Sequence, residues 1–289
     1  MTARREWRET RRVPGSGSGQ WQKQLPAGSG QVDYDGVPDL LERVTAFRAT
    51  FARRQAAEIV ELPGAFAVRD PVFSRSQEHN QLIVETPDAD PAALPGLAVQ
   101  GLGVRRQYRI TVLDEALGAR ATPVLAAVGY ERDTDLILAR ETAGSVLPEC
   151  AAHRVELAEL RAAVFRQQLD WSPDEDLARQ LTERRTARLR GAEKVLFLAA
   201  RAPDGEITAW TDLYLDPTTG LAQLEDLVTA TPHRGQGHGD TLLATGLALA
   251  AAAGIPQLFL TADVNDWPRE WYARRGFTEL GRSHSFLHR

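Results

Sequence analysis

The chain has 289 residues, a formal net charge of −5 and a single cysteine. That length is enough for one large domain or two ordinary ones with a full hydrophobic core. The acidic balance argues against nucleic-acid binding, which is usually carried by a basic domain. Cys150 alone cannot form an internal disulfide or a thiolate metal cluster, so a reducing cytoplasm is the expected location.

The first 35 residues are expected to form a disordered tail. Glycine and serine runs at 15–19 and 28–30 favour flexible chain over packing. Five arginines lie among the first twelve residues, but no apolar segment follows them, so no secretory signal is predicted. The most apolar window, Leu242–Ala253, is too short to span a bilayer and fits a helix packed on a sheet.

Residues 36–145 are predicted to form a first domain of helices and strands. In chain order we expect a helix at Pro38–Val60, strands at Ala65–Val68 and Asn80–Glu85, a helix at Pro91–Gly103, a strand at Tyr108–Asp114, a helix at Gly118–Val128 and a strand at Thr134–Leu138. The polar loop Asp70–Asn80 is either a plain surface loop or part of the wall of an acceptor cleft.

A second domain is predicted over residues 150–289, after turn-forming residues interrupt the pattern at Glu141–Glu149. Its first strand falls around Ala151–Leu157, and Ser172 is the expected N-cap of its second helix. The further elements are helices at Val155–Gln168 and Pro173–Arg190, strands at Lys194–Ala200, Glu206–Leu215 and Gln223–Ala230, a helix at Asp240–Ala253, a strand at Gln257–Val264, a helix at Pro268–Arg275 and a strand at Ser283–His288.

The order strand, helix, Gly-aromatic, strand occurs in both halves of the chain. Gly129-Tyr130 marks it in the first half and Gly276-Phe277 in the second. Unless the order recurs by chance, it predicts two structural repeats rather than one continuous sheet. The first copy has no glycine-rich loop, and Asp88 and Asp90 before its helix would repel a phosphate.

A glycine-rich turn separates the strand ending near 230 from the long helix that follows. Gly235, Gly237 and Gly239 lack a Cβ, so the backbone can adopt positive φ and bring its N–H groups to a ligand. The start of the helix favours an anion. No lysine follows, as it would in a Walker A loop, and Asp240 breaks the dinucleotide fingerprint. The turn therefore indicates another kind of pyrophosphate site, unless it is a tight turn without a ligand.

The motif Arg234-x-x-Gly237-x-Gly239 resembles the acyl-CoA loop of the GNAT acetyltransferase superfamily. Asn265, Tyr272 and Gly276-Phe277 follow at the spacing that GNAT enzymes show. The resemblance covers residues 150–289. It implies an α/β (α+β) protein with two GNAT-like domains, each a mixed, mostly antiparallel sheet flanked by helices, of which the N-terminal one is degenerate.

The resemblance also implies an N-acetyltransferase that moves the acetyl group of acetyl-CoA directly to an amine, without a covalent intermediate. Acetyl-CoA would lie where the strands 223–230 and 257–264 splay apart. The cofactor-binding residues implied are Leu227, Val228, Thr229, Arg234, Gly235, Gln236, Gly237, His238, Gly239, Asp240 and Asn265.

The N-terminal domain would shape the acceptor site or stabilise the pair of domains. A small-molecule amine is the expected acceptor and a protein amine stays open, whereas neither a nucleic acid nor a membrane is expected as a partner. A non-catalytic acyl-CoA sensor or regulatory module is the alternative.

Two residues are candidates for the chemistry. Tyr272 would donate a proton to the leaving thiolate, unless it is a core tyrosine packed by Trp271 and Phe277. Glu225 is the candidate base, although strand alternation places it and Asp226 on opposite faces and either carboxylate could be structural.

Asn265 would bond to CoA or cap the following helix. The six histidines show no metal-ligand spacing, so no metal is expected.

Overall fold

A computed structural model describes residues 39–289, so the tail expected at 1–35 lies outside the described residues. The first half contains α2 (Leu40–Gln55), β1 (Glu58–Leu62), β2 (Ala65–Arg69), β3 (Gln81–Val84), α3 (Leu94–Leu102), β4 (Tyr108–Val112), α4 (Glu115–Ala127) and β5 (Glu131–Glu141). The second half contains β6 (His153–Val155), α5 (Leu157–Trp171), α6 (Glu175–Glu183), α7 (Arg185–Arg188), β7 (Lys194–Arg201), β8 (Ile207–Asp216), β9 (Leu221–Thr229), α8 (His238–Ala252), β10 (Gln257–Asp263), α9 (Pro268–Ala273) and β11 (Thr278–His288).

The predicted order of elements is confirmed, but two helices differ in their bounds. The helix expected over Pro38–Val60 ends at Gln55, because Ala56 turns to an extended conformation and the β-prone residues after it form β1. The helix expected over Pro173–Arg190 divides into α6 and α7. Its N-cap is Asp174, whose carboxylate accepts from the Leu177 N–H at 3.0 Å, rather than Ser172.

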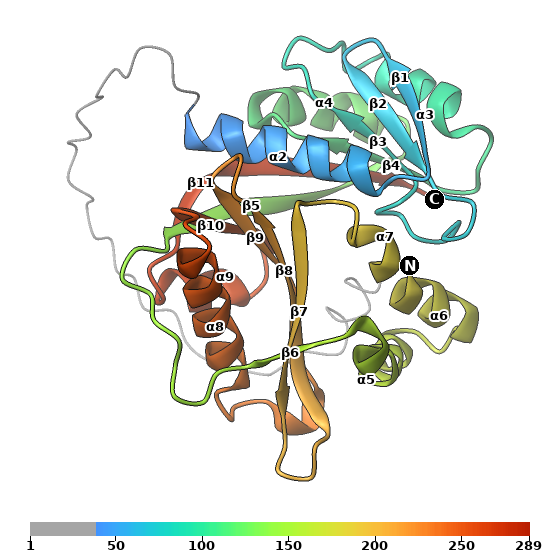
Figure 1. Ribbon diagram of the computed structural model, residues 1–289. Helices are drawn as coiled ribbons and strands as arrows, with labels where there is room; N and C mark the ends of the chain where they lie inside the picture. The colour runs from blue at the N-terminus through green and yellow to red at the C-terminus, as the bar shows by residue number, and fades with distance from the viewer. Residues whose placement is uncertain (1–38) are drawn as a thin grey trace, which may run out of the picture.

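All the described strands form one sheet, in the order β1-β2-β3-β4-β11-β5-β10-β9-β8-β7-β6 (Figure 1). The pairs β3–β4 and β9–β10 are parallel and the other eight pairs are antiparallel, which confirms a mixed, mostly antiparallel arrangement.

The two halves exchange strands at the middle of this sheet. The last strand, β11, lies between β4 and β5 of the first half, and β5 pairs in turn with β10 of the second half. We expected two repeats rather than one continuous sheet, and this expectation is wrong, because strands of both halves pair in a single sheet. Alternating burial along a strand says which side chains face the core, but not which strand lies beside it.

Helices cover both faces of the sheet. Figure 1 shows α8 and α9 on one side of strands β7–β9 and α5–α7 on the other. The helix α2 crosses from the first half onto the second: Phe47 packs edge-on against Phe259 of β10, and Phe51 stacks on Tyr214 of β8 with ring centroids 4.4 Å apart. Among residues 39–289, no helix combines the length and the apolar character that crossing a bilayer would require.

Candidate active site

The neighbouring strands β9 and β10 separate partway along their length. Residues 257–259 pair with 221–223, and the ladder ends there. Beyond that point β9 continues along β8, and β10 continues along β5. Since each strand keeps its outer partner after the inner ladder has ended, the two strands diverge between 224–229 and 260–263. This is the opening in which the sequence resemblance places acetyl-CoA.

A glycine loop lies between β9 and α8. Gly235 and Gly237 have φ of 77° and 84°, and no heavy atom lies within 4 Å of where a Cβ would stand at either residue. Gly237 is the N-cap of the 15-residue helix α8, so the first N–H groups of the helix face this loop. A glycine backbone bordering open space at a helix N-terminus fits a pyrophosphate.

The charged side chains around this loop are partly compensated. Arg234 donates from Nε to the Thr229 carbonyl at 3.3 Å. Asp240, in the first turn of α8, forms an ion pair with Arg275, whose guanidinium lies 3.8 Å from the centre of the Trp271 ring. Sequence reasoning missed Arg275, which neutralises a carboxylate that would otherwise repel a phosphate at this helix end.

The remaining predicted loop residues lie around the same opening. Gln236 donates to the Pro232 carbonyl at 3.5 Å, and His238 lies with its ring 6.3 Å from that of His233. A Cβ on Gly239 would stand 3.5 Å from Trp271 and 3.6 Å from Leu227, which is ordinary contact. The end of β9, where Leu227, Val228 and Thr229 lie, borders the loop.

Asn265 follows β10 and donates its backbone N–H to the Asp263 carboxylate at 2.8 Å. The helix α9 begins at Pro268 with Trp267 as its N-cap and has no side-chain cap bond. The expectation that Asn265 caps this helix is therefore wrong, because it stands two positions before the N-cap residue. Its contact with CoA stays a prediction.

Tyr272 lies on α9 and is 8% exposed. Its ring packs edge-on against Trp271 and Phe277, with centroids 4.9 and 5.6 Å apart. Burial and the negative charge of Glu225 raise the pKa of the Tyr272 phenol well above its ordinary value. The side chain is thus a packed core residue whose hydroxyl keeps its proton and lies within electrostatic reach of the candidate base.

A β-bulge at Asp226 and Leu227 directly follows Glu225. The register between β8 and β9 shifts between Trp210 and Asp212. Asp226 has a φ of 51° and is the only described residue other than glycine with a positive φ. Because a bulge breaks the alternation of faces, Glu225 and Asp226 both line the same cavity. The expectation that they point to opposite faces is therefore wrong.

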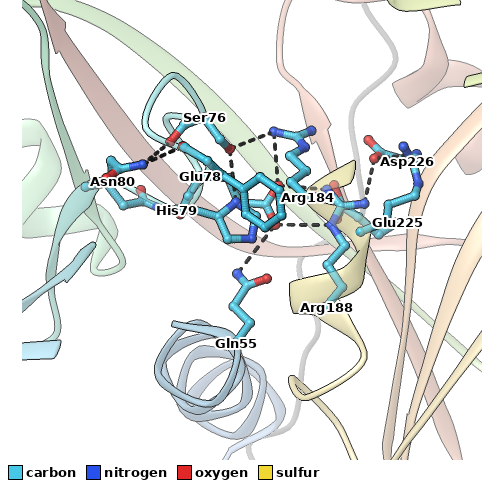
Figure 2. A network of polar contacts seen from close by, with 12 residues as sticks. Gln55, Ser76, Glu78, His79, Asn80, Arg184, Arg188, Glu225 and Asp226 are labelled. Atoms are coloured by element: carbon cyan, nitrogen blue, oxygen red, sulfur yellow. Dashed lines mark hydrogen bonds and ion pairs between the residues drawn. The ribbon is translucent and has the colours of Figure 1, made fainter. Parts of the chain in front are cut away.

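Asp226 belongs to a buried ion network that joins the halves of the chain (Figure 2). Its Oδ2 lies 2.9 Å from Arg185 and 2.7 Å from Arg188. Arg188 also pairs with Asp212 of β8 and, through Nε and Nη2, with Glu78 of the loop Asp70–Asn80. The exposed fractions of Arg185, Arg188 and Asp212 are 2%, 1% and 0%, so these charges are stable in the interior only as a set.

These contacts decide which carboxylate can act as a base. Although burial opposes ionisation, Arg188, Arg185 and Arg184 hold the pKa of Asp226 well below its ordinary range. Such a carboxylate is a poor proton acceptor. Glu225 instead accepts from the Gln223 amide at 2.8 Å and lies one residue from the network.

A cavity of about 860 Å³ lies where the two halves meet. Helix α2, the loop Asp70–Asn80, helices α5–α7 and strands β8 and β9 all contribute to its wall. The loop thus lines a cavity rather than being a plain surface loop, and its role toward an acceptor stays a prediction. Arg184, Arg185 and Arg188 were missed because their spacing reads as the polar side of a helix, although three arginines within five residues of an acidic chain were a signal.

Among residues 39–289 no three His, Cys, Asp or Glu side chains gather as a metal site would require. Cys150 is exposed.

Residues 156–277 match the model of the acetyltransferase (GNAT) family. The match identifies this part of the chain as an acyltransferase domain. No curated protein matches the chain.

Solved structures share the fold across both halves. A GCN5-related N-acetyltransferase from Kribbella flavida aligns with a TM-score of 0.58 and 17% identity over 86% of this chain and 95% of its own. A conserved protein of unknown function from Staphylococcus epidermidis aligns with a TM-score of 0.59 and 13% identity over 81% and 94%. An acetyltransferase of the GNAT family from Novosphingobium aromaticivorans aligns with a TM-score of 0.51 and 14% identity over 84% and 97%.

Proposed function

Because residues 156–277 form a domain of the GNAT acetyltransferase family, we propose that the protein transfers the acetyl group of acetyl-CoA directly to an amine. The observation that carries the proposal is the meeting of two features at one place. The ladder between β9 and β10 ends at Gln223 and Phe259, and the glycine cradle at the start of α8 borders the opening. The single cysteine of the chain makes a cytoplasmic location part of the same proposal.

Each group of residues has a role in this proposal. The backbone of Gly235 and Gly237 and the first turn of α8 hold the pyrophosphate. The end of β9, Leu227–Thr229, offers backbone groups to the pantetheine and to the thioester carbonyl, where negative charge develops. Acetyl-CoA supplies the acyl group as a thioester.

Two side chains move the protons. Glu225, which lines the cavity beside the opening, takes a proton from the acceptor amine. The Tyr272 hydroxyl, kept protonated by its burial, gives a proton to the sulfur as the carbon–sulfur bond breaks. No covalent bond to the protein is needed, and Asp226 takes no part because its charge is used by Arg185 and Arg188.

The cofactor site is tested with Gly239→Glu and its uncharged isostere Gly239→Gln. Ordinary contact distances at the Cβ position allow both variants to fold, and only the first brings a carboxylate into the cradle. Calorimetric titration with acetyl-CoA should give tight binding to the wild type, moderately weaker binding to Gly239→Gln and binding to Gly239→Glu that is weaker by a further factor of about 10 or more.

Failure of the folded wild type to bind acetyl-CoA would contradict the proposal. Binding without release of free CoA in the presence of any amine would favour the alternative, a non-catalytic acyl-CoA sensor. If free CoA is released, size-fractionated amine pools separate a small acceptor from a protein one.

A further inference from the structure

The cavity is cationic in a chain that is acidic as a whole. Eight arginines line it among the described residues, against four carboxylates, namely Glu78, Asp135, Glu225 and Asp226. The net charge of the chain is −5. A cavity lined mainly by one sign of charge concentrates ligands of the opposite sign. The acceptor is therefore expected to be anionic outside its reactive amine.

The arginines of the ion network differ in how fully they are neutralised. Arg188 contacts three carboxylates, with oxygens of Glu78, Asp212 and Asp226 each at 2.7 Å. Arg185 contacts Asp212 at 3.2 Å and Asp226 at 2.9 Å. These two guanidinium groups have their counter-charges inside the protein.

Arg184 differs in that its one ion pair is longer and shared, and in that its side chain is more exposed to the cavity. Its Nη1 lies 3.3 Å from Glu78 Oε2, an oxygen that Arg188 already holds at 2.7 Å, and 3.4 Å from Ser76 Oγ. Among the described residues its Nε has no hydrogen-bond partner. Arg185 also has an Nη1 without a partner among the described residues, but that side chain is almost completely covered. The Arg184 side chain lines the cavity and is 16% exposed, whereas Arg185 and Arg188 are almost completely covered. Burial lowers the pKa of Arg184 although the charge of Glu78 opposes the shift, while the pKa values of Arg185 and Arg188 are raised.

Two other arginines of the cavity, Arg75 and Arg48, have internal partners. Arg75 pairs with Asp174 at 2.7 Å and with Asp176 at 3.5 Å. Arg48 donates to Ser283 at 3.0 Å, and its charge interacts with those of Asp135 and Glu225.

We propose that the acceptor is a small amine carrying a carboxylate, and that Arg184 is the specificity-determining residue that binds this carboxylate. The proposal rests on the proposed function, because it assigns the acceptor of the same acyl transfer. A guanidinium binds a carboxylate through two parallel hydrogen bonds. A ligand carboxylate would give Arg184 a counter-charge of its own, beside the Glu78 carboxylate that it shares with Arg188. The amine end then lies toward Glu225, which lines the same cavity. The cavity volume of about 860 Å³ is within the range of small-molecule pockets.

The test compares matched acceptors in a thiol-release assay with acetyl-CoA. Each set contains an amino acid, its carboxamide and its aminophosphonate analogue. The sets differ in the distance between the amine and the acid group. The wild type should prefer the carboxylate in at least one set. Arg184→Met should lower kcat/KM for that amino acid by about 10- to 100-fold and leave the carboxamide nearly unchanged.

Two further variants keep the test decisive. Arg184→Lys retains the charge without the fork geometry and should recover part of the preference. Arg75→Met removes the same charge from the same cavity at a residue that is already paired, and should leave the preference intact. The affinity for acetyl-CoA should not change in any of them.

Equal or better turnover of the carboxamide or the aminophosphonate by the wild type would overturn the proposal, as would an unchanged preference in Arg184→Met. Absence of transfer to every amine despite acetyl-CoA binding would instead overturn the proposed function, and this inference with it.

Discussion

Tyr272 is a packed side chain for which we propose a chemical role. The ring is held by Trp271 and Phe277, and the hydroxyl has a raised pKa. Tyr272→Phe should therefore keep the packing and the acetyl-CoA affinity, but lower turnover by about 10²-fold because the leaving thiolate loses its proton donor. Steady-state kinetics and calorimetry on the same preparations measure both quantities. Unchanged turnover would exclude the phenol as the acid.

Because His79 is buried, we expect the free energy of unfolding to depend on pH. The side chain is 1% exposed and its Nδ1 lies 3.0 Å from Ser76 Oγ. Burial lowers the pKa of His79 to about 4. At pH values between about 6.5, the ordinary pKa of a histidine, and the lowered pKa of His79, the unfolded chain binds a proton that the folded chain does not. The free energy of unfolding therefore falls as the pH falls through this range.

The slope from this one group is at most about 1.4 kcal/mol per pH unit. His79→Gln cannot take up that proton, so its free energy of unfolding should decrease less between pH 6.5 and 4 than that of the wild type. Urea unfolding at several pH values measures the difference, and parallel profiles for the two proteins would contradict the assignment.

At the level of elements, local patterns were sufficient for most of the chain. Apolar periodicity predicted helices and strands near their observed positions, and the glycine loop was found because only a few residue types suit positive φ at a helix start. The bulge at Asp226 was not predictable in this way. It depends on the register with β8 and on Arg185 and Arg188, which hold a non-glycine residue at a φ of 51°.

The ion network was missed for a related reason. Glu78 and Arg188 are 110 positions apart, and neither belongs to a motif. Their pairing follows from the loop Asp70–Asn80 reaching α7 across the cavity, which is a tertiary contact. Spacing along a helix predicted a solvated polar side, whereas in the structure these arginines are buried between the two halves and line the cavity.

For the molecule as a whole, the exchange of β5 and β11 makes each half depend on the other. Without β5, the strands β10 and β11 would each lose a partner and expose an unpaired edge. The apolar contacts of α2 with β8 and β10 would be lost as well. The segment between Glu141 and Glu149 is thus a connection in the sequence, but it does not separate two independent sheets.

Because the halves exchange strands, we expect different results from isolating one half and from cleaving the connection between them. A fragment of residues 150–289 should not unfold cooperatively or bind acetyl-CoA, although it contains every residue assigned to the cofactor. A protease site inserted after Gly144, which has a φ of 74° and open space around it, gives the control. After cleavage the two pieces should stay together in size-exclusion chromatography and keep the acetyl-CoA affinity, because the sheet remains complete. A folded 150–289 fragment that binds acetyl-CoA would show that β5 is dispensable.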